Sequence, residues 1–503
     1  MFLESTISDI ENYPFLNPFR FENDPSKKYW HISTLESLLE ENWKSIEEGV
    51  TENREYLAAR EKIFSSSVLQ YFTDQKNRII QESLETDNSF QILGAYTCLL
   101  DSIVQTAFDY SFIDIPLIKE KLLEELNHEL NYKQKNLPEK KEKLKLLKEQ
   151  ILEMEKNLES GSSSSREYRY FQEVESQHES ETRVLEERIE ELQQLIPQIQ
   201  EFTNDKNFAL NHLVIFARGG YGRAELGLSS DRDLGYCLDT NRLNNGEAEM
   251  LRQLIVHIEN LLRNSGVETA HQYFEIDEDL SRFDEVNTLH TIPSILESRV
   301  LLGSESLATN LKNRFFQVIT FEPYVLNLVR SFSESKEPEL NRMDLKMDYG
   351  GLRSLQIPLW ITAATFGIFP SQTADLLAFL IQKHLLSHRQ ALKLCQALEF
   401  LHDLRNFSAV AKEHYFDDEA RDIGCVQENL LQDQLNDSLE RLYLLKKNRF
   451  KNVDEFDRFR LQMMEQIGEL SKVILDRLLD RTIVRTFSKF QVVVHLGNRR
   501  VVE

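Results

Sequence analysis

Two aspartates and a glycine-rich turn are the residues in this sequence whose types and spacing could support catalysis. Asp231 and Asp233 follow the turn Arg218–Arg223, which reads RGGYGR. Because side chains alternate along a strand, the two carboxylates are predicted to face the same side, where they can share divalent metal ions. Arg232, between them, is predicted to point the other way.

The glycine turn supplies a second chemical feature. Glycines let the backbone approach a ligand closely, and a short helix beginning at Tyr221 or Gly222 would direct main-chain N–H groups at an anion above the carboxylates. A phosphate-binding turn beside a metal-binding pair indicates phosphoryl or nucleotidyl transfer.

Strands and helices must position these groups. The apolar runs Leu213–Ala217 and Leu234–Leu238 predict strands on either side of the turn. An amphipathic helix is predicted over 246–264, ended by Ser265-Gly266, and a further strand over 267–275. Enzymes with this arrangement often draw a third metal carboxylate from such a strand, for which Glu268 and Glu275 are the candidates.

Composition limits the class of partner. The 503 residues include 83 acidic and 59 basic ones, and the net charge of −24 opposes binding to nucleic acid or to an anionic membrane. No apolar run approaches the roughly 18 residues of a membrane span, and the N-terminus lacks the basic start and apolar core of a signal peptide. Four widely spaced cysteines form neither a zinc pattern nor a disulfide framework. We therefore expect a cytoplasmic protein with nucleotide or protein partners.

The remaining chain is predominantly helical in pattern. Heptad-like spacing over 117–158 and 167–199 brackets the serine run 160–165, which predicts a coiled-coil helical hairpin. Its function stays open between a solvated helix pair and an arm for dimerisation or docking. We divide the chain into an N-terminal helical region (1–115), the hairpin (116–200), a catalytic domain (205–325) and a C-terminal helical domain with a terminal hairpin (326–503).

Three segments carry a family resemblance. The sequence GGYGRAEL followed by SSDRDL resembles the GGYGRGEL and SDxDL signature of the bacterial PII-protein uridylyltransferase/uridylyl-removing enzymes, with Ala224 in place of a glycine. The segment 344–356, DLKMDYGGLRSLQ, resembles the family's DIKEGPGGLRDLQ at the same length, and 295–303 resembles its LLEAR-LAG helix. The resemblance covers roughly residues 205–500. Within 295–303, Glu297 and Arg299 either orient the site or pair on the surface.

The resemblance implies an α+β fold with a polymerase-β-like nucleotidyltransferase core. It implies transfer of UMP or AMP from a nucleoside triphosphate to an acceptor, expected to be a regulatory PII-like protein, with Mg²⁺ or Mn²⁺ as cofactor. The metals would be held by Asp231 and Asp233. The nucleotide would be held by Gly219, Gly220, Arg223, Ser230, His271, Lys346 and Arg353.

Two departures bear on function. The family's Gly-His-Ser-Val-Arg-like run stands here as Ala270–Phe274 (AHQYF), which keeps His271 and loses the arginine. The family's HD hydrolase and sensing domains have no counterpart after Val502, and His402-Asp403 lacks the partners of an HD metal site, so it is interpreted as part of an ordinary helix. We therefore expect a one-way transferase that does not respond to glutamine. The alternative is a catalytically silent scaffold that binds proteins through the hairpin.

Overall fold

The computed structural model describes most of the chain between Leu35 and Arg500. The described residues are 35, 37–39, 41–42, 53–85, 89–159, 165–228, 230–276, 285–318, 321–338, 344–369, 372–416, 450, 453–486, 495–496 and 499–500. The predictions for residues 1–34, for the serine turn at 160–164 and for Cys425 lie outside them.

A four-stranded mixed sheet lies at the centre of the fold. Its strands are β1 (Leu213–Ala217), β2 (Asp233–Leu238), β3 (Ala270–Glu275) and β4 (Arg299–Gly303), in the order β3-β2-β1-β4. The pair β2 and β3 is parallel, and β1 is antiparallel to both β2 and β4. The helix α9 (Asn245–Asn264) makes the crossover between the parallel strands and ends at Ser265, before Gly266 with its φ of +71°.

Strand β4 corrects the prediction for residues 295–303. Helix α10 (Glu285–Leu296) stops at Leu296, and residues 299–303 form a strand rather than the end of a helix. The physical reason is tertiary, because the backbone of β4 completes the hydrogen bonding of β1, with Leu302 opposite Ile215.

Strand β1 is buried along its whole length because it has a hydrophobic core on each face. Val214 and Phe216 belong to one core, with α10 and α11 (Glu305–Val318). Leu213, Ile215 and Ala217 belong to the other, with α9, α3 (Asn53–Glu85) and α4 (Ser89–Ile113). A strand covered on both faces reads as a continuous apolar run, as this one does.

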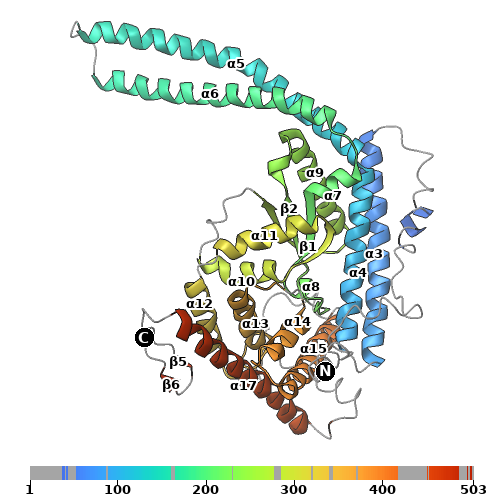
Figure 1. Cartoon of the computed structure of the whole chain (residues 1–503). Coiled ribbons are helices and arrows are strands. Elements are labelled where there is room, and N and C mark those ends of the chain that lie inside the picture. The colour runs from blue at the N-terminus through green and yellow to red at the C-terminus, as the bar shows by residue number, and fades with distance from the viewer. Residues whose placement is uncertain are drawn as a thin grey trace.

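The helices from α12 onward pack below the sheet in the view of Figure 1. Its helices are α12 (Phe321–Ser333), α13 (Leu352–Phe366), α14 (Thr373–Gln382), α15 (His388–Phe416) and α17 (Val453–Thr486). Near the C-terminus, β5 (His495–Leu496) pairs antiparallel with β6 (Arg499–Arg500), while their connecting residues lie outside the described ones.

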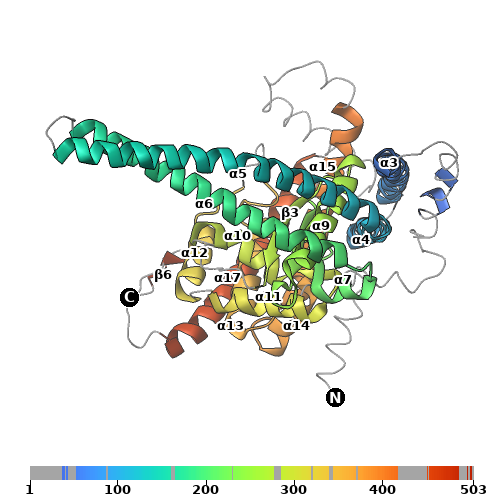
Figure 2. The same cartoon turned by 90° about the horizontal axis from the view of Figure 1, so that it is seen from above.

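Two long helices, α5 (Ile115–Glu159) and α6 (Ser165–Glu201), leave the body together as an arm (Figures 1 and 2). They run antiparallel, since the ion pairs Glu129–Arg188, Lys140–Glu181 and Lys148–Glu179 advance along one helix as they retreat along the other. The short helix α7 (Lys206–His212) then leads into β1. Whether the arm is a coiled coil, and the division into four domains, stay predictions.

No described helix is both long enough and apolar enough to cross a membrane. Three cysteines, Cys98, Cys237 and Cys395, are free thiols. Burial raises the pKa of Cys237 and of Cys395 to about 12, which fits packing rather than reactive residues.

Candidate active site

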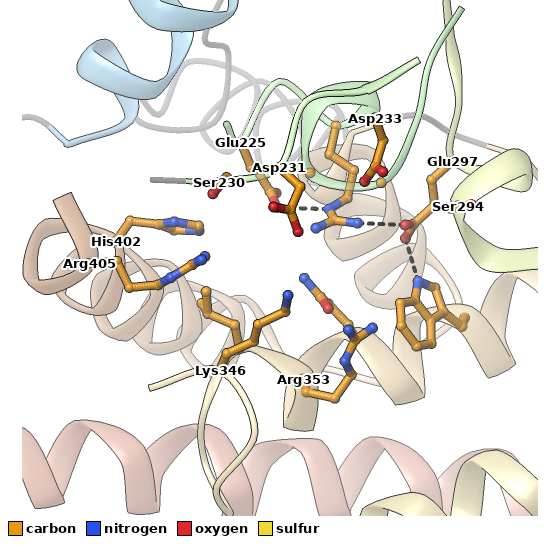
Figure 3. Close-up of a pocket in the computed structure, with 16 residues that line it drawn as sticks. Glu225, Ser230, Asp231, Asp233, Ser294, Glu297, Lys346, Arg353, His402 and Arg405 are labelled. Atoms are coloured by element: carbon orange, nitrogen blue, oxygen red, sulfur yellow. Dashed lines mark hydrogen bonds and ion pairs between the residues drawn. The ribbon is translucent and has the colours of Figure 1, made fainter. Parts of the chain in front are cut away.

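A cavity of about 340 Å³ opens beside the start of β2. It is lined by the glycine turn, the residues that lead into β2, the 346–360 segment and α15. Figure 3 shows Asp231 and Asp233 on one wall with Lys346, Arg353 and Arg405 facing them. The lining residues are Gly219, Gly220, Arg223, Glu225, Ser230, Asp231, Asp233, Ser294, Glu297, Lys346, Leu352, Arg353, Gln356, Trp360, His402 and Arg405.

The two aspartates lie on the same side of the chain. Both line the cavity, whereas Arg232 points away from it, donates to the Tyr96 hydroxyl at 3.0 Å and lies over the ring of Phe72. Burial raises the pKa of Asp233, and Arg218, whose Nη2 lies 3.8 Å from Asp233 Oδ1, opposes that rise.

The glycine turn forms a four-residue helix, α8 (Gly219–Gly222), which begins two or three residues before the predicted start at Tyr221 or Gly222. Gly219 has a φ of +54°, and a Cβ there would lie 3.3 Å from Asp233 Oδ2. A Cβ on Gly222 would lie 2.7 Å from the carbonyl oxygen of Glu297, closer than real Cβ atoms come. Glycine at these two positions therefore lets the turn pack against β2 and against the residues before β4.

Ala224 occupies a position with left-handed backbone. Its φ is +58° and its side chain is fully buried. Glycine tolerates this conformation and alanine is strained in it by roughly 1–2 kcal/mol. A glycine at this position would adopt the same backbone conformation without this strain.

Arg223, predicted to bind phosphate, is held by two carboxylates of the protein. Its guanidinium is buried between two carboxylates, with Nε 2.8 Å from Glu225 Oε2 and Nη1 2.6 Å from Glu297 Oε2. Two of its three nitrogens, Nε and Nη1, are therefore engaged by carboxylates of the protein. Arg223 lies at the cavity wall, where the Nη2 group is the part of the guanidinium that these carboxylates leave for a ligand.

Three cations remain for an anion in the cavity. Lys346, Arg353 and Arg405 have no salt bridge among the residues that the structure describes. Partial burial lowers the pKa of Lys346, with Arg353 and Arg405 adding to the effect. Burial also lowers the pKa of Arg353 to about 10 and that of Arg405 below its ordinary value. Cations held close together in a partly buried place favour a multiply charged anion among them.

His271 does not reach the cavity. It lies on β3 opposite Leu234, and neighbours in register share a face, so its exposed side chain lies on the other face of the sheet from Asp233. Its Nδ1 lies 3.3 Å from Glu259. His271 is therefore not among the residues that line this cavity, because β3 presents it on the opposite face, and its predicted role in nucleotide binding has no support from the cavity.

The two candidates for a third metal carboxylate also lie elsewhere. Glu275 is at the far end of β3, opposite Leu238, where it accepts hydrogen bonds from Arg252 and Tyr273. Glu268 has an exposed side chain and does not line the cavity.

Several lining residues were missed by sequence reasoning. Arg405 and His402 come from α15, and the helical pattern of that segment gave no sign of a site. Glu297, for which a surface pair was one interpretation, is buried and receives a hydrogen bond from Trp360 Nε1 at 2.7 Å. Arg299 instead binds Asp101 with both terminal nitrogens, at 2.9 and 3.0 Å.

The chemistry of the cavity suits a magnesium-bound polyphosphate. No group of three or more metal-ligating side chains occurs among the described residues, so a metal here would have two carboxylates. Mg²⁺ is commonly bound by one or two carboxylates, with substrate phosphates and water completing its shell. The donor set and the three facing cations fit such a complex.

Comparisons with known proteins agree with the expected resemblance. A family described as GlnD PII-uridylyltransferase matches residues 330–474, the segment that carries Lys346, Arg353 and Arg405. Three similar proteins are bifunctional uridylyltransferase/uridylyl-removing enzymes. The one from Zymomonas mobilis is 30% identical over 165 residues, that from Rhodospirillum rubrum 24% over 282, and that from Ectopseudomonas mendocina 30% over 206.

These alignments cover part of each protein. They include 31%, 54% and 38% of this chain and 17%, 27% and 21% of the respective relatives. The resemblance to the uridylyltransferase family is thus confirmed at low identity, and this chain matches about a quarter or less of the length of these relatives.

Proposed function

We propose that this protein is a metal-dependent nucleotidyltransferase that transfers UMP or AMP from a nucleoside triphosphate to a hydroxyl of a PII-like regulatory protein. The observation that carries the proposal is the placement of Asp231 and Asp233 across one cavity from Lys346, Arg353 and Arg405. The mixed sheet with these carboxylates at the start of β2 also supports a polymerase-β-like core.

The acidic and basic residues of the cavity would have different roles. Asp231 and Asp233 would hold Mg²⁺ or Mn²⁺, which supplies charge neutralisation and Lewis acidity at the reacting phosphate. Lys346, Arg353 and Arg405 would offset most of the negative charge of a triphosphate and of the departing pyrophosphate. Gly219 and Gly220 would allow the phosphates to approach the main chain, and Ser230 would offer a hydroxyl donor.

The reaction is a substitution at the α-phosphorus. The acceptor oxygen forms a bond to this phosphorus and its proton passes to solvent, while the bond from the α-phosphorus to the bridging oxygen breaks and pyrophosphate leaves with that electron pair. The protein's part is to align the acceptor with the leaving group and to stabilise the charge that moves onto the pyrophosphate.

One argument for a catalytically silent scaffold, the loss of the family's arginine, is weakened by the position of the residue that replaces it. The family's arginine corresponds to Phe274, which is fully buried between Phe216 and Phe315 in the core, with ring centroids 6.2 and 5.5 Å away. A change at this core position leaves the described cavity residues in place. A dimer formed through the arm stays a further prediction.

The test is incubation of the protein with each α-labelled nucleoside triphosphate, Mg²⁺ or Mn²⁺, and a PII-like protein. We expect label on the acceptor with one nucleotide and none with the double variant Asp231→Asn/Asp233→Asn. Nucleotide binding without labelling of the acceptor or of the protein itself, under any of these conditions, would support the scaffold instead.

A further inference from the structure

A buried chain of polar contacts joins the two walls of the cavity. It begins at Arg223, next to α8, and passes through Glu297, between α10 and β4, to Trp360 on α13 (Figure 3). The distances are 2.6 Å from Arg223 Nη1 to Glu297 Oε2 and 2.7 Å from Trp360 Nε1 to Glu297 Oε1. All three side chains are at most 7% exposed.

The charges of this chain depend on one another. Burial alone would raise the pKa of Glu225, but Arg223 and His402 lower it below its ordinary value, so this carboxylate is ionised. Arg223 then has two carboxylates to satisfy, and burial raises the pKa of Glu297 in spite of Arg223. The indole N–H of Trp360 provides the further hydrogen bond that favours the ionised form of Glu297.

Trp360 in turn holds Arg353. The guanidinium carbon of Arg353 lies 4.8 Å from the centroid of the Trp360 ring, within the range of a cation–π contact. Arg353 Nε is buried and has no hydrogen-bond partner among the described residues. The negative charge of Glu297 favours the charged form of Arg353, while Arg223 disfavours it. The placement of this cation thus depends on the indole face and on the carboxylate behind it.

We propose that Glu297 and Trp360 are positioning residues, which fix the Arg353 cation opposite the aspartate pair, with Arg223 as their anchor on the sheet. This inference rests on the proposed function for the identity of the anion, a nucleoside triphosphate. Glu297 orients the indole through its N–H, and the indole face orients the guanidinium. The aspartate wall and the cation wall are thereby kept at a fixed separation, which a polyphosphate must span.

Two conservative variants test the proposal. Trp360→Phe keeps an aromatic face and removes the N–H donor, and Glu297→Gln keeps the side-chain size and removes the charge. Asp101→Asn is the matched control, because it disrupts the ion pair with Arg299, two residues after Glu297, without altering a cavity residue. Folding of each variant is checked by circular dichroism and thermal unfolding.

The first readout is binding of inorganic triphosphate to the metal-free protein by calorimetry. We expect Trp360→Phe and Glu297→Gln to weaken binding at least fivefold, Arg353→Ala at least tenfold, and Asp101→Asn less than twofold. Equal affinity of the wild type and both conservative variants overturns the proposal, as does a wild type that does not bind triphosphate. If Glu297→Gln does not fold, the affinity of Trp360→Phe for triphosphate alone tests the proposal.

The second readout separates positioning from a general loss of structure. A displaced cation raises the KM for the nucleoside triphosphate, whether or not kcat also falls, whereas a smaller folded fraction lowers kcat at unchanged KM. If the affinities for triphosphate follow the expected order from wild type to variants but the wild type transfers no nucleotide, the proposed function is refuted and the positioning role stands. The converse, transfer with a KM unaffected by both variants, refutes the positioning role alone.

Discussion

Replacing Asp233 with asparagine should change stability in opposite directions with and without metal. Burial raises the pKa of Asp233, Arg218 opposes the rise and Asp231 adds to it. A carboxyl whose pKa is higher in the folded state contributes its stability fully below the unfolded pKa and loses it as the pH rises through the folded pKa. At pH 7 the ionised side chain therefore opposes folding, so the metal-free variant should be at least as stable as the wild type.

With bound metal, the wild type should instead be more stable than the Asp233→Asn variant. At a metal concentration of 100 times Kd the wild type should gain about 2.7 kcal/mol. At the Mg²⁺–oxygen distance of about 2.1 Å, a divalent cation and one carboxylate attract each other by about 4 kcal/mol even at the dielectric constant of water. Because one of only two carboxylates is lost, the variant should show almost none of the metal-dependent gain. Transfer activity should fall at least ~100-fold.

The assay is thermal and urea unfolding at pH 7, in EDTA and across a Mg²⁺ or Mn²⁺ titration. Asp239→Asn is the control, since Asp239 follows the other end of β2 and does not line the cavity. The reasoning is refuted if the variant keeps the metal-dependent gain of the wild type, or if its metal-free form loses more than about 1 kcal/mol, a change larger than surface substitutions usually cause.

Three further predictions concern acid stability, strain and the arm. Burial lowers the pKa of His402 to about 4, so its neutral form is favoured on folding, and stability should fall as the pH drops below the unfolded value of about 6.5, by about 2 kcal/mol at pH 5. His402→Gln should flatten this part of the urea-derived profile, and an unchanged slope contradicts the assignment. Ala224→Gly should raise the unfolding free energy by up to about 1 kcal/mol, because relief of left-handed strain outweighs a lost buried methyl group of about 0.8 kcal/mol. Ala217→Gly, at a buried strand position, should lower the unfolding free energy. Equal losses of stability in both variants would contradict the presence of strain at Ala224. Replacing residues 133–186 by a short Gly-Ser linker should leave triphosphate binding within twofold, because the cavity takes no residue from the arm. A larger loss in calorimetry would show that the arm supports the cavity.

The parts of the site that local sequence could predict are those carried by short motifs. Asp231 and Asp233 were placed correctly because alternation along an extended segment requires only neighbouring residues. Lys346 and Arg353 were found because the Gly-Gly turn before α13 lies in the same thirteen-residue motif. Residues 299–303 were misassigned because a short apolar run after a helix does not distinguish a strand from continued helix.

The other parts of the site depend on tertiary structure. Arg405 and His402 belong to a long helix whose apolar pattern indicates its core face, and nothing local shows that these two residues line a cavity together with Asp233. One partner of Arg223 is equally hard to predict from local sequence, because Glu297 is 74 residues away. His271 was proposed for the site because it matches a motif, but the register of β3 places it on the face of the sheet opposite Asp233, and it does not line the cavity.

The arm sets a length scale for any partner that binds near its tip. Its buried root includes Leu126 and Leu192, and the 33 residues of α5 beyond Leu126 extend about 50 Å at the rise of an α-helix. A protein bound at the tip could not insert a side chain into the cavity from there. A flexible loop tethered to it, searching a sphere of that radius, would instead be present at an effective concentration of a few millimolar. The arm would then accelerate modification of a weakly bound acceptor by local concentration, without taking part in the transfer step.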